Sequence, residues 1–580
     1  MGSDVARARR GLRNPEGLRD RIPAEVLAVG RALVQGQQGA RVNLVGGAVV
    51  DLLRGRRPKD WDLEVFGLSL GEVEARASRL GKANTVGRAF GIVKLALPSG
   101  LDLDLSVPRR DNKIGVGHSD IESQLDPRMT DREAARRRDF TINSLAINLK
   151  TGKLIDPFGG LKDLQAGVLR ATDPKLFVED PMRAFRAMQL LARKARTVDP
   201  STLRLIRGMK GEFQHLAPER VLEEWRKLLL RSDKPSVGLD FLHDSGWISH
   251  FPELAVLEST PQHPDWHPEG DVWTHTKQIA DAAAQTRHRV PEGQREAFVF
   301  GALLHDVGKP ATTVTPRMVA EGLAPKEMLY TAHGHDAKGK EPARRFMERM
   351  KASKKTTALA EALVGSHMQP YNLKSGGAGR AAYARLARKI RAAGGDLQLL
   401  AVLSQCDACA TGQGRHFHLG EPDWEHETSK NLLSWAERVD TPAAAAPLVK
   451  GRDLIKLGHK PGQHFKVILD YAQSLQDQGL GREVILEAVQ REYPAAKKNR
   501  RRRARRNPKL YGSLPAAGWA ESEIRREGFH SIVALGKGRS KDGPVLIYEA
   551  VEGRGERYRL NVGRFRGQDR LHVRAFRLDQ

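Results

Sequence analysis

The apolar positions near the start of this 580-residue chain change period within a short distance. Between Leu44 and Phe66 an apolar entry leads to paired glycines, a short amphipathic segment and a basic turn. Polar and apolar side chains then alternate from Asp60 to Glu64, which is the period of a β-strand. Two further strand-like runs, Ile92–Leu97 and Leu101–Val107, meet at a Pro-Ser-Gly turn. These patterns predict a small mixed α/β domain.

Helical spacing dominates the middle of the chain. Pro23 to Val34 is an earlier helical pattern, and Ser69 with Glu72 three residues later forms a capping-box signature for another. After residue 171 apolar residues recur every three or four positions, as they do from Glu179 to Arg193. The following helix runs to Leu230, and further helical patterns continue to about residue 493. This part is expected to be all-α.

The last part of the chain returns to strand periodicity. Eight of the ten residues from Lys497 to Arg506 are basic, and like charges at that density repel, so we expect an arm-like linker there. Arg557, Arg559, His572 and Arg574 alternate with apolar residues, which predicts a small β-rich module with a basic face. Its expected strands are Ser531–Leu535, Val545–Val551, Arg557–Val562 and Leu571–Leu578.

Together these patterns predict an α+β multidomain protein. We expect an α/β head, an all-α neck, a second helical domain and a β-rich C-terminal module. The expected divisions are a basic leader and helix at 1–38, the head at 39–170, the neck at 171–260, the second helical domain at 261–440, a helical tail at 441–496, the basic linker at 497–508 and the β-rich module at 509–580.

Charge and cysteine content narrow the possible partners. The formal net charge is +26, and so basic a chain most often has a polyanionic partner, with nucleic acid the first candidate. Cys406 and Cys409 are the only cysteines, so no disulfide framework is expected. No apolar run reaches the roughly 20 residues of a membrane span, and the N-terminus lacks a secretory signal pattern. We therefore expect no membrane association and a cytoplasmic location.

Acidic residues on the strand after the basic turn are the first candidate site. Alternate side chains of a strand share a face, so Asp60, Asp62 and Glu64 would lie together. Their mutual repulsion favours a bound cation, and Mg²⁺ held by carboxylates and substrate phosphates is the usual one. Gly46 and Gly47 suit a backbone that approaches a triphosphate closely.

The order of paired glycines, short helix, basic turn and Asp-x-Asp strand resembles a known family. It is similar to the polymerase β-like nucleotidyltransferase head of class II tRNA nucleotidyltransferases (CCA-adding enzymes) and bacterial poly(A) polymerases. The chain departs from that family at Val50, where the family motif has arginine. The resemblance implies that Asp60 and Asp62 are catalytic and hold Mg²⁺. It also implies a third carboxylate at Asp104, with Asp102 as the alternative.

Two further motifs carry the resemblance and imply nucleotide contacts. The segment RRRDFTINSLA places three arginines before an expected apolar helix, where they would form either a solvated first turn or a triphosphate site. It resembles the family's RRDFTxNA element. The segment EDPMR resembles the family's EDxxR element, in which Asp and Arg read the edge of the incoming base. The implied nucleotide-binding residues are Gly46, Gly47, Arg137, Arg138, Asp139, Asn143, Glu179, Asp180, Arg183 and Arg186.

Histidines and aspartates in the second helical domain form another candidate site. An H…HD…D series on predicted helices resembles an HD phosphohydrolase domain, which one bacterial subgroup of CCA-adding enzymes carries after the neck. The implied ligands of a divalent metal, whose identity stays open, are His275, His305, Asp306 and Asp407. His333, His335 and His367 lie in the same region of the chain.

The resemblance implies template-independent, Mg²⁺-dependent addition of CCA to tRNA from CTP and ATP, with a second, metal-dependent phosphohydrolase site in the HD domain. The basic tail would contact RNA. One alternative is a poly(A) polymerase, and another is an enzyme that adds only CC or only A. A third, of another class, is an HD phosphohydrolase whose head binds RNA but is inactive.

Overall fold

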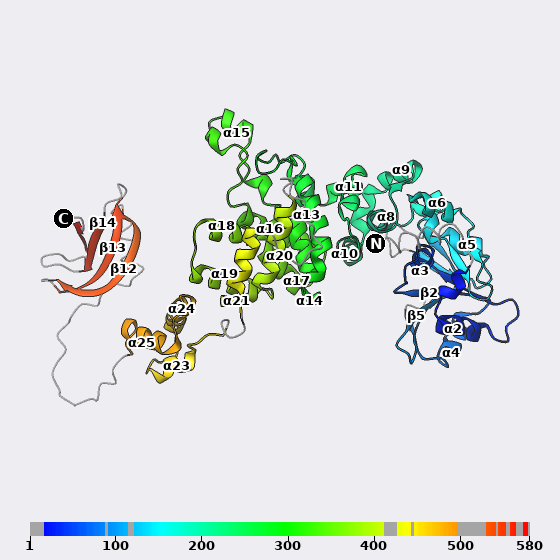
Figure 1. Ribbon diagram of the computed structural model, residues 1–580, viewed down its shortest axis with the longest axis horizontal. Coiled ribbons are helices and arrows are strands. Elements are labelled where there is room, and N and C mark those ends of the chain that lie inside the picture. The colour runs from blue at the N-terminus through cyan, green and yellow to red at the C-terminus, as the bar shows by residue number, and fades with distance from the viewer. Residues whose placement is uncertain are drawn as a thin grey trace. The chain divides into compact units, whose positions relative to one another are not determined.

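The computed structural model describes residues 17–86, 91–113, 121–410, 426–441, 446–495, 529–540, 543–552, 557–563 and 572–577. The chain divides into two compact units, residues 1–495 and 496–580 (Figure 1). The first unit contains the head, the neck, the second helical domain and the helical tail. The expected combination of an α/β head, an all-α middle and a β-rich end is confirmed.

A seven-stranded sheet in the order β3-β4-β5-β2-β1-β8-β9 forms the head. The pairing of β2 with β5 is parallel, and the others in this sheet are antiparallel. The predicted strand after the basic turn is confirmed from Trp61 onward, whereas Asp60 precedes it. The sheet strands are β1 (Arg41–Val45), β2 (Trp61–Phe66), β3 (Lys82–Val86), β4 (Ile92–Ala96), β5 (Asp102–Ser106), β8 (Ala146–Asn148) and β9 (Leu154–Ile155).

Short helices and two smaller β-pairs complete the head. Ser69 and Glu72 form the predicted capping box at the start of α4. The helical elements are η1 (Leu18–Arg21), α2 (Ala24–Val34), α3 (Gly47–Leu53), α4 (Leu70–Ala77), α5 (Asp131–Arg136), η3 (Thr141–Asn143) and α6 (Gly160–Ala166). The remaining strands are β6 (Arg109–Lys113) with β7 (Ile121–Leu125), and β10 (Val168–Leu169) with β11 (Thr197–Val198).

The expectation that three arginines precede an apolar helix is wrong. A capping box of Thr130 and Glu133 starts α5 earlier, so Arg136 ends that helix and Arg137 caps its C-terminus. The apolar residues that follow, Phe140, Ile142, Leu145 and Ile147, are buried but do not keep a helical period. The chain there forms only the short turn η3 and then enters β8.

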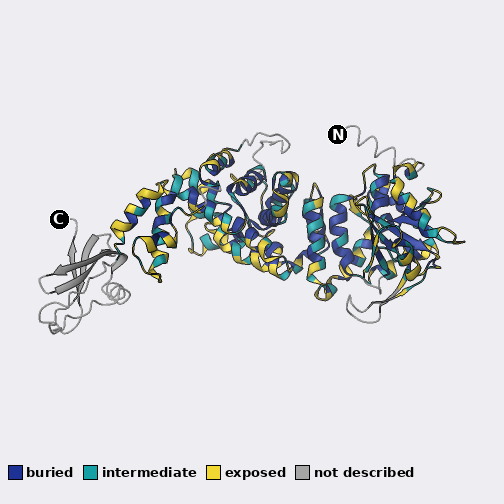
Figure 2. Cartoon of the chain, turned by 90° about the horizontal axis from the view of Figure 1, so that it is seen from below, coloured by how far each residue is buried: buried dark blue, intermediate teal, exposed yellow. Residues whose placement is uncertain are grey.

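The neck is helical, and an aromatic cluster joins it to the next domain. Trp225 and Phe251 of the neck lie edge-to-face or tilted against Phe346, with ring centroids 5.7 and 5.6 Å away. Buried residues concentrate on the head sheet and on facing sides of the neck helices (Figure 2). The neck elements are α7 (Pro174–Phe177), α8 (Met182–Arg193), α9 (Pro200–Gly208), η4 (Lys210–His215), α10 (Pro218–Arg231), α11 (Ser236–Asp244), η5 (Trp247–His250) and α12 (Pro252–Ala255).

The second helical domain packs its helices around a mainly aliphatic core that includes Leu303, Leu363 and Leu400. Its elements are α13 (Val272–Thr286), η6 (Arg287–Arg289), α14 (Glu292–Leu304), η7 (Lys309–Ala311), α15 (Pro316–Ala320), η8 (Lys326–Met328), α16 (His335–Arg349), α17 (Lys354–Val364), α18 (Gln369–Ser375), α19 (Arg380–Ala392), α20 (Leu397–Ala410) and α21 (Glu427–Val439). Cys406 lies in this core as a free thiol, 3.1 Å from Thr286 Oγ1.

The helical tail has a small core of its own, which includes Leu454, Ile468 and Ile485. Its helices are α23 (Gly451–Lys456), α24 (His464–Asp477) and α25 (Arg482–Glu492). In the second unit the four predicted strands are confirmed as one antiparallel sheet in chain order. They are β12 (Phe529–Ser540), β13 (Gly543–Glu552), β14 (Arg557–Gly563) and β15 (His572–Arg577). The basic linker at 497–508 lies outside the described residues.

Candidate active sites in the head and the helical domain

Gly46 and Asp62 form the centre of the head site. Gly46 has φ 71° and ψ −141°, a conformation that favours glycine, and the next residue begins α3. A Cβ at position 46 would lie 3.3 Å from Asp62 Oδ2 and 3.7 Å from a guanidinium nitrogen of Arg138. The glycine therefore lets the main chain pass close to a carboxylate and a cation at once. A phosphate group with its counter-ion needs the same kind of approach.

The neighbouring strand brings a second carboxylate to this place. Asp104 is the register partner of Asp62 in the parallel pairing of β2 and β5. Burial raises the pKa of Asp62, and the charges of Asp104 and Asp60 add to this rise against the opposing effect of Arg138. Lys94 of β4 lies 2.9 Å from Asp104 Oδ1 and neutralises part of the charge.

These head carboxylates are neighbours, but their oxygen atoms do not lie close enough together to form a complete set of metal ligands. Groups of three or more ligand atoms within 4.8 Å of one another occur, among the described residues, in the second helical domain, and Asp60, Asp62 and Asp104 form no such group. Asp60 is exposed because it precedes β2, and Asp104 is held by Lys94. Neighbouring carboxylates of this kind are still a donor set that suits Mg²⁺.

Glu64 lies further along the strand that carries Asp62 and holds two arginines. Its carboxylate is almost fully buried, and Oε1 lies 3.3 Å from Arg137 and 3.6 Å from Arg138. Both arginines follow α5, and both remain partly exposed. Glu64 therefore fixes a doubly cationic segment beside Asp62.

A second network joins the predicted Asp139, Asn143, Asp180 and Arg186. Asp139 Oδ1 accepts hydrogen bonds from Phe140 N and from Asn143 Nδ2, at 2.8 and 2.9 Å. The guanidinium of Arg186 lies 3.5 Å from both Asp139 and Asp180. Burial would raise the pKa of Asp139, but the charge of Arg186 and the bond from Asn143 outweigh it and keep that pKa below its usual value.

Arg183, which is expected to read the base, is held between α7 and the arginine segment of the head. Its side chain is buried, and its two terminal nitrogens donate to main-chain carbonyls, Leu176 O and Arg137 O, both at 2.8 Å. Arg183 thus connects α8 to α7 and to the arginine segment of the head. Arg186, one turn later on α8, is about one-third exposed. Glu179 is half-buried just before α8.

Val50, which replaces the family's arginine, is fully buried in α3. A basic side chain reaches this helix from elsewhere, because Lys194 lies 3.2 Å from Asp51 Oδ1 and donates to Gly47 O at 3.3 Å. Lys194 follows α8 directly. The helix that begins at the second glycine is therefore tied to the end of the helix that carries Arg183 and Arg186.

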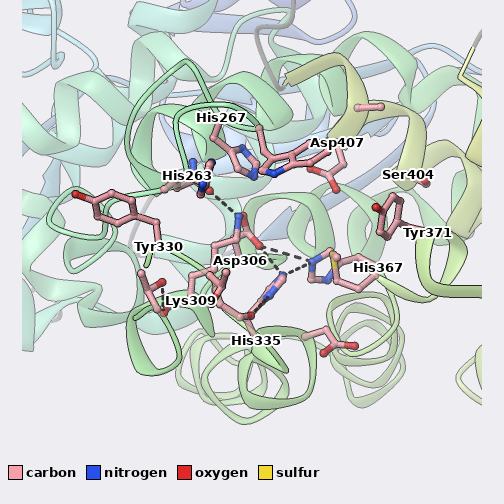
Figure 3. Close-up of a pocket in the computed structure, with 18 of the residues that line it drawn as sticks. His263, His267, Asp306, Lys309, Tyr330, His335, His367, Tyr371, Ser404 and Asp407 are labelled. Atoms are coloured by element: carbon pink, nitrogen blue, oxygen red, sulfur yellow. Dashed lines mark hydrogen bonds and ion pairs between the residues drawn. The ribbon is translucent and has the colours of Figure 1, made fainter. Parts of the chain in front are cut away.

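The second helical domain brings the four predicted ligands together. His275 comes from α13, His305 and Asp306 follow α14, and Asp407 lies on α20. His275 Nε2 lies 2.9 Å from Asp407 Oδ1, and His305 Nε2 lies 3.1 Å from Asp306 Oδ2 and 3.8 Å from Asp407 Oδ1. Asp306 and Asp407 line a cavity of about 1120 Å³ together with His335 and His367 (Figure 3).

Hydrogen bonds at Nδ1 orient four imidazoles, those of His335 and His367 in the cavity wall and those of His275 and His305 beside Asp306 and Asp407. His305, His335 and His367 direct Nδ1 to the carbonyls of Ala302, Ala332 and Val364, at 2.7–2.8 Å. His275 directs Nδ1 to Glu269 at 2.9 Å. A ring whose Nδ1 carries the shared proton presents Nε2 as a lone pair, and His305 Nε2 is buried without a hydrogen bond. This donor set fits a divalent metal such as Zn²⁺, Mn²⁺ or Fe²⁺.

The pKa values of two histidines at this site depend on burial and on the same neighbouring groups. Burial disfavours the charged form of His275, but hydrogen bonds to Asp407 and Glu269 outweigh it and raise its pKa to about 9. Burial and the neighbouring His335 and His305 lower the pKa of His367 to about 4. His275 therefore carries a proton at neutral pH at the position that faces Asp407, where a cation would otherwise lie. Metal binding would displace such a proton.

Several residues in or beside this cavity were not predicted from the sequence. Glu269 is buried and accepts from both His267 and His275, and Lys309 bridges Asp306 Oδ2 and Gln262 Oε1 at 2.7 and 2.6 Å. His335 and His367 were noticed in the chain but not assigned as ligands. The spacing of His267, Glu269 and His275 before α13 could have suggested the first group, because a carboxylate near a metal-binding histidine commonly orients it.

Sequence comparison gives matches over all three of these regions. Residues 42–170 match the Poly A polymerase head domain, 197–257 match the probable RNA and SrmB-binding site of polymerase A, and 272–411 match the HD domain. A Multifunctional CCA protein of Stenotrophomonas maltophilia is 35% identical over 339 residues, which are 57% of this chain and 77% of that protein. The chain belongs to the CCA-adding enzyme and poly(A) polymerase family. The resemblance noted in the motifs is thereby confirmed, and the chain is a nucleotidyltransferase with an HD domain.

Other members of the family are similarly related. A Multifunctional CCA protein of Xanthomonas campestris is 36% identical over 340 residues, covering 57% of this chain and 76% of that protein. The solved CCA-adding enzyme of Bacillus stearothermophilus in complex with CTP superposes with a TM-score of 0.55 at 20% identity, over 81% of this chain and 96% of that one. This likeness shows a shared fold. No helix in the described part of this family member is long and apolar enough to span a membrane.

Proposed function

We propose that this chain adds CCA to the 3′ end of tRNA without a nucleic acid template, using CTP and ATP. The observation that carries the proposal is the pair Asp62 and Asp104 on adjacent parallel strands beside the close main-chain approach at Gly46. Relatives named Multifunctional CCA protein, at 34–36% identity, support the choice of reaction. We also propose the head, neck and HD divisions given above as its functional parts.

In this proposal Asp60, Asp62 and Asp104 hold Mg²⁺. The ion would supply charge neutralisation at the α-phosphate and a lowered pKa of the RNA 3′-hydroxyl. Arg137 and Arg138 would bind the triphosphate, because Glu64 fixes both guanidinium groups beside Asp62. Gly46 leaves room for that group, since any side chain there would meet Asp62.

Base selection would fall to the network at the start of α8. Arginine supplies donors and aspartate supplies acceptors, so a neighbouring pair can match the donor and acceptor pattern of cytosine or adenine. Asp180 and the partly exposed Arg186 form such a pair. Asp139 also contacts Arg186, and Asn143 in turn donates a hydrogen bond to Asp139. Arg183 would hold α8 against the arginine segment through its hydrogen bond to Arg137 O.

The HD domain would carry a second, independent hydrolytic activity. Its histidines and aspartates would hold a divalent metal, which would supply Lewis-acid activation for cleavage of a phosphate ester. We propose that it acts as a phosphatase or 2′,3′-cyclic phosphodiesterase on RNA ends. Lys309, buried next to Asp306 at the cavity wall, would contribute positive charge for the phosphate.

The deciding experiment offers the purified chain three RNAs with CTP and ATP separately. The RNAs are a tRNA that ends before CCA, one that ends after CC, and an unrelated RNA. We expect CTP to extend the first tRNA by two C residues, ATP to extend the second by one A, and neither nucleotide to extend the unrelated RNA. Long A tracts on all three would indicate a poly(A) polymerase, and addition to one tRNA alone would indicate CC-only or A-only activity.

The two activities can be separated in the same preparation. A variant with His305→Ala and Asp306→Ala should lose hydrolysis of a 2′,3′-cyclic nucleotide and keep CCA addition. Asp62→Asn is the matched control, with the opposite result expected. Loss of both activities in either variant, with an unchanged melting temperature, would contradict two independent sites.

A further inference from the structure

Two side chains cross between α3 and the end of α8 in opposite directions. Lys194 caps the C-terminus of α8 and is buried, and its Nζ donates to Gly47 O at 3.3 Å and lies 3.2 Å from Asp51 Oδ1. Arg54 caps the C-terminus of α3 and donates from Nη1 to Arg193 O at 3.0 Å and from Nη2 to Lys194 O. The last carbonyls of a helix lack partners within it, so Arg54 satisfies two groups that α8 leaves open.

Lys194 makes its contacts directly at the glycine turn. A Cβ added at Gly47 would lie 3.5 Å from Lys194 Nζ, and the preceding Gly46 is where the main chain approaches Asp62. The helix α3 has the sequence GAVVDLL and contains no basic residue, and Val50 within it is fully buried. The positive charge beside the start of α3 therefore comes from the end of the neck helix α8.

The same helix holds the arginine segment of the head near its other end. Arg183 donates to Arg137 O at 2.8 Å, and Arg186, which is proposed to read the base, lies one turn further along α8. At a rise of 1.5 Å per residue, Arg183 and Lys194 are attached about 16 Å apart along the helix. One helix therefore fixes two parts of the head, the arginine segment near its start and the glycine turn at its end.

We propose that Lys194 is a positioning residue that sets the spacing between the glycine turn and the base-reading side chains of α8, for a nucleotide that contacts both. The inference rests on the proposed function, in which the triphosphate lies at Gly46 and the base at Arg186. A ligand held at two places gains affinity when both are spaced to fit it, and a misplacement of about 1 Å can cost about 100-fold in rate. Lys194 would touch neither part of the nucleotide, because Asp51 and Gly47 O already occupy its ammonium group.

Equilibrium binding to the full-length chain in the presence of Mg²⁺ tests the proposal. CTP is the probe that spans both places, and inorganic tripolyphosphate, measured by competition with CTP, is the probe that needs the glycine turn and the arginine segment alone. Lys194→Met should weaken binding of CTP by about tenfold or more, because the spacing between the two places is lost. It should leave the affinity for tripolyphosphate unchanged. Lys194→Arg retains a donor and a charge and should bind CTP as the parent chain does.

Two further variants separate positioning from general loss of packing. Leu191→Ala is the matched control, because Leu191 is buried near the same end of α8, and it should lower the melting temperature without changing the ratio of the two affinities. Asp51→Asn removes the ion pair and keeps the hydrogen bond to Gly47 O, so it should show a smaller loss that is again confined to CTP.

The outcomes also separate this inference from the proposed function. Equal weakening of CTP and tripolyphosphate in Lys194→Met would overturn the inference and make Lys194 a phosphate contact. Unchanged binding of CTP in Lys194→Met, or tripolyphosphate that does not compete with CTP in the parent chain, would overturn it as well. A parent chain that binds CTP and adds nothing to tRNA would contradict the proposed function alone, because the binding comparison needs no RNA. A parent chain that does not bind CTP would overturn both.

Discussion

Asp104 lies directly opposite Asp62 in the parallel pairing of β2 and β5. Residues in register on neighbouring strands point to the same face of a sheet, so the pairing places both carboxylates beside the approach at Gly46. Asp104 is also the register partner of Lys94 on the other side, and Lys94 Nζ donates to both of its oxygens. Asp104 is therefore the carboxylate of β5 that lies in the same cross-strand row as Asp62 of the Asp-x-Asp strand.

The first prediction follows from this row. Asp104→Asn should lower CCA addition by at least tenfold, and Asp62→Asn should abolish it, because each removes a charge that the metal needs. Asp102→Asn is the matched control on the same strand, and we expect a smaller loss because its β4 partner is Ala96 and it is exposed. Single-turnover incorporation of CTP measures the effect. Equal losses for Asp102→Asn and Asp104→Asn would contradict the assignment.

This row also separates what local sequence can predict from what it cannot. The strand at Trp61, the capping box at Ser69 and the turn before β5 follow from short-range patterns, and they were predicted correctly. The choice between Asp102 and Asp104 depends on the register of strands about forty residues apart. Register is set by pairing across the sheet, which a single sequence does not reveal.

Two predictions were wrong or incomplete for related reasons. One is the helix expected after Arg138, and the other is the set of residues at the HD cavity. The apolar residues after Arg138 suggested a helix, but the earlier start of α5 at a capping box left them to a turn and to β8. His335 begins α16 and His367 lies in the turn after α17, so the two meet only through the packing of those segments. The sequence alone does not show that histidines without a fixed spacing share a site.

The second prediction concerns the two arginines of α8. Arg186→Ala should reduce discrimination of CTP and ATP against UTP and GTP by about 1–3 kcal/mol, because its guanidinium beside Asp180 is partly exposed and can donate to a base. The measured quantity is kcat/KM for each nucleotide.

Arg183→Ala is the informative comparison for this prediction. Two hydrogen bonds from Arg183 to buried carbonyls would be lost, so we expect a lower free energy of unfolding as well as weaker addition of every nucleotide. If Arg183→Ala alone changed nucleotide preference, base reading would belong to Arg183 and not to Arg186.

The third prediction concerns Glu269, which accepts from Nδ1 of both His267 and His275. These two bonds contribute to a pKa of Glu269 of about 2, so the group is a carboxylate throughout the physiological range. Glu269→Gln should weaken binding of Co²⁺ in the HD cavity by about 10–100-fold, because a carboxylate that orients a ligating histidine commonly contributes that much.

Visible absorption of the bound Co²⁺ checks this effect without any substrate. His263→Ala is the control, since His263 lines the cavity but belongs to none of the three groups with metal-ligand spacing among the described residues. Unchanged Co²⁺ affinity and an unchanged spectrum in Glu269→Gln would show that Glu269 supports only the fold around α13.

The fourth prediction concerns Lys497 to Arg506, which stays a prediction from sequence. Replacing its eight basic residues with glutamine should weaken binding of tRNA and leave the added nucleotides unchanged, because phosphate contacts are not specific for sequence. Each neutralised phosphate contributes about −0.7 to −0.9 to the slope of log K against log salt. If half of the basic run engages phosphates, its replacement flattens the slope by roughly two to four. Affinity is measured at several salt concentrations for both chains. Identical slopes would exclude RNA binding by this segment and leave a protein partner as its role, whereas a changed product sequence would mean that the segment acts on the head.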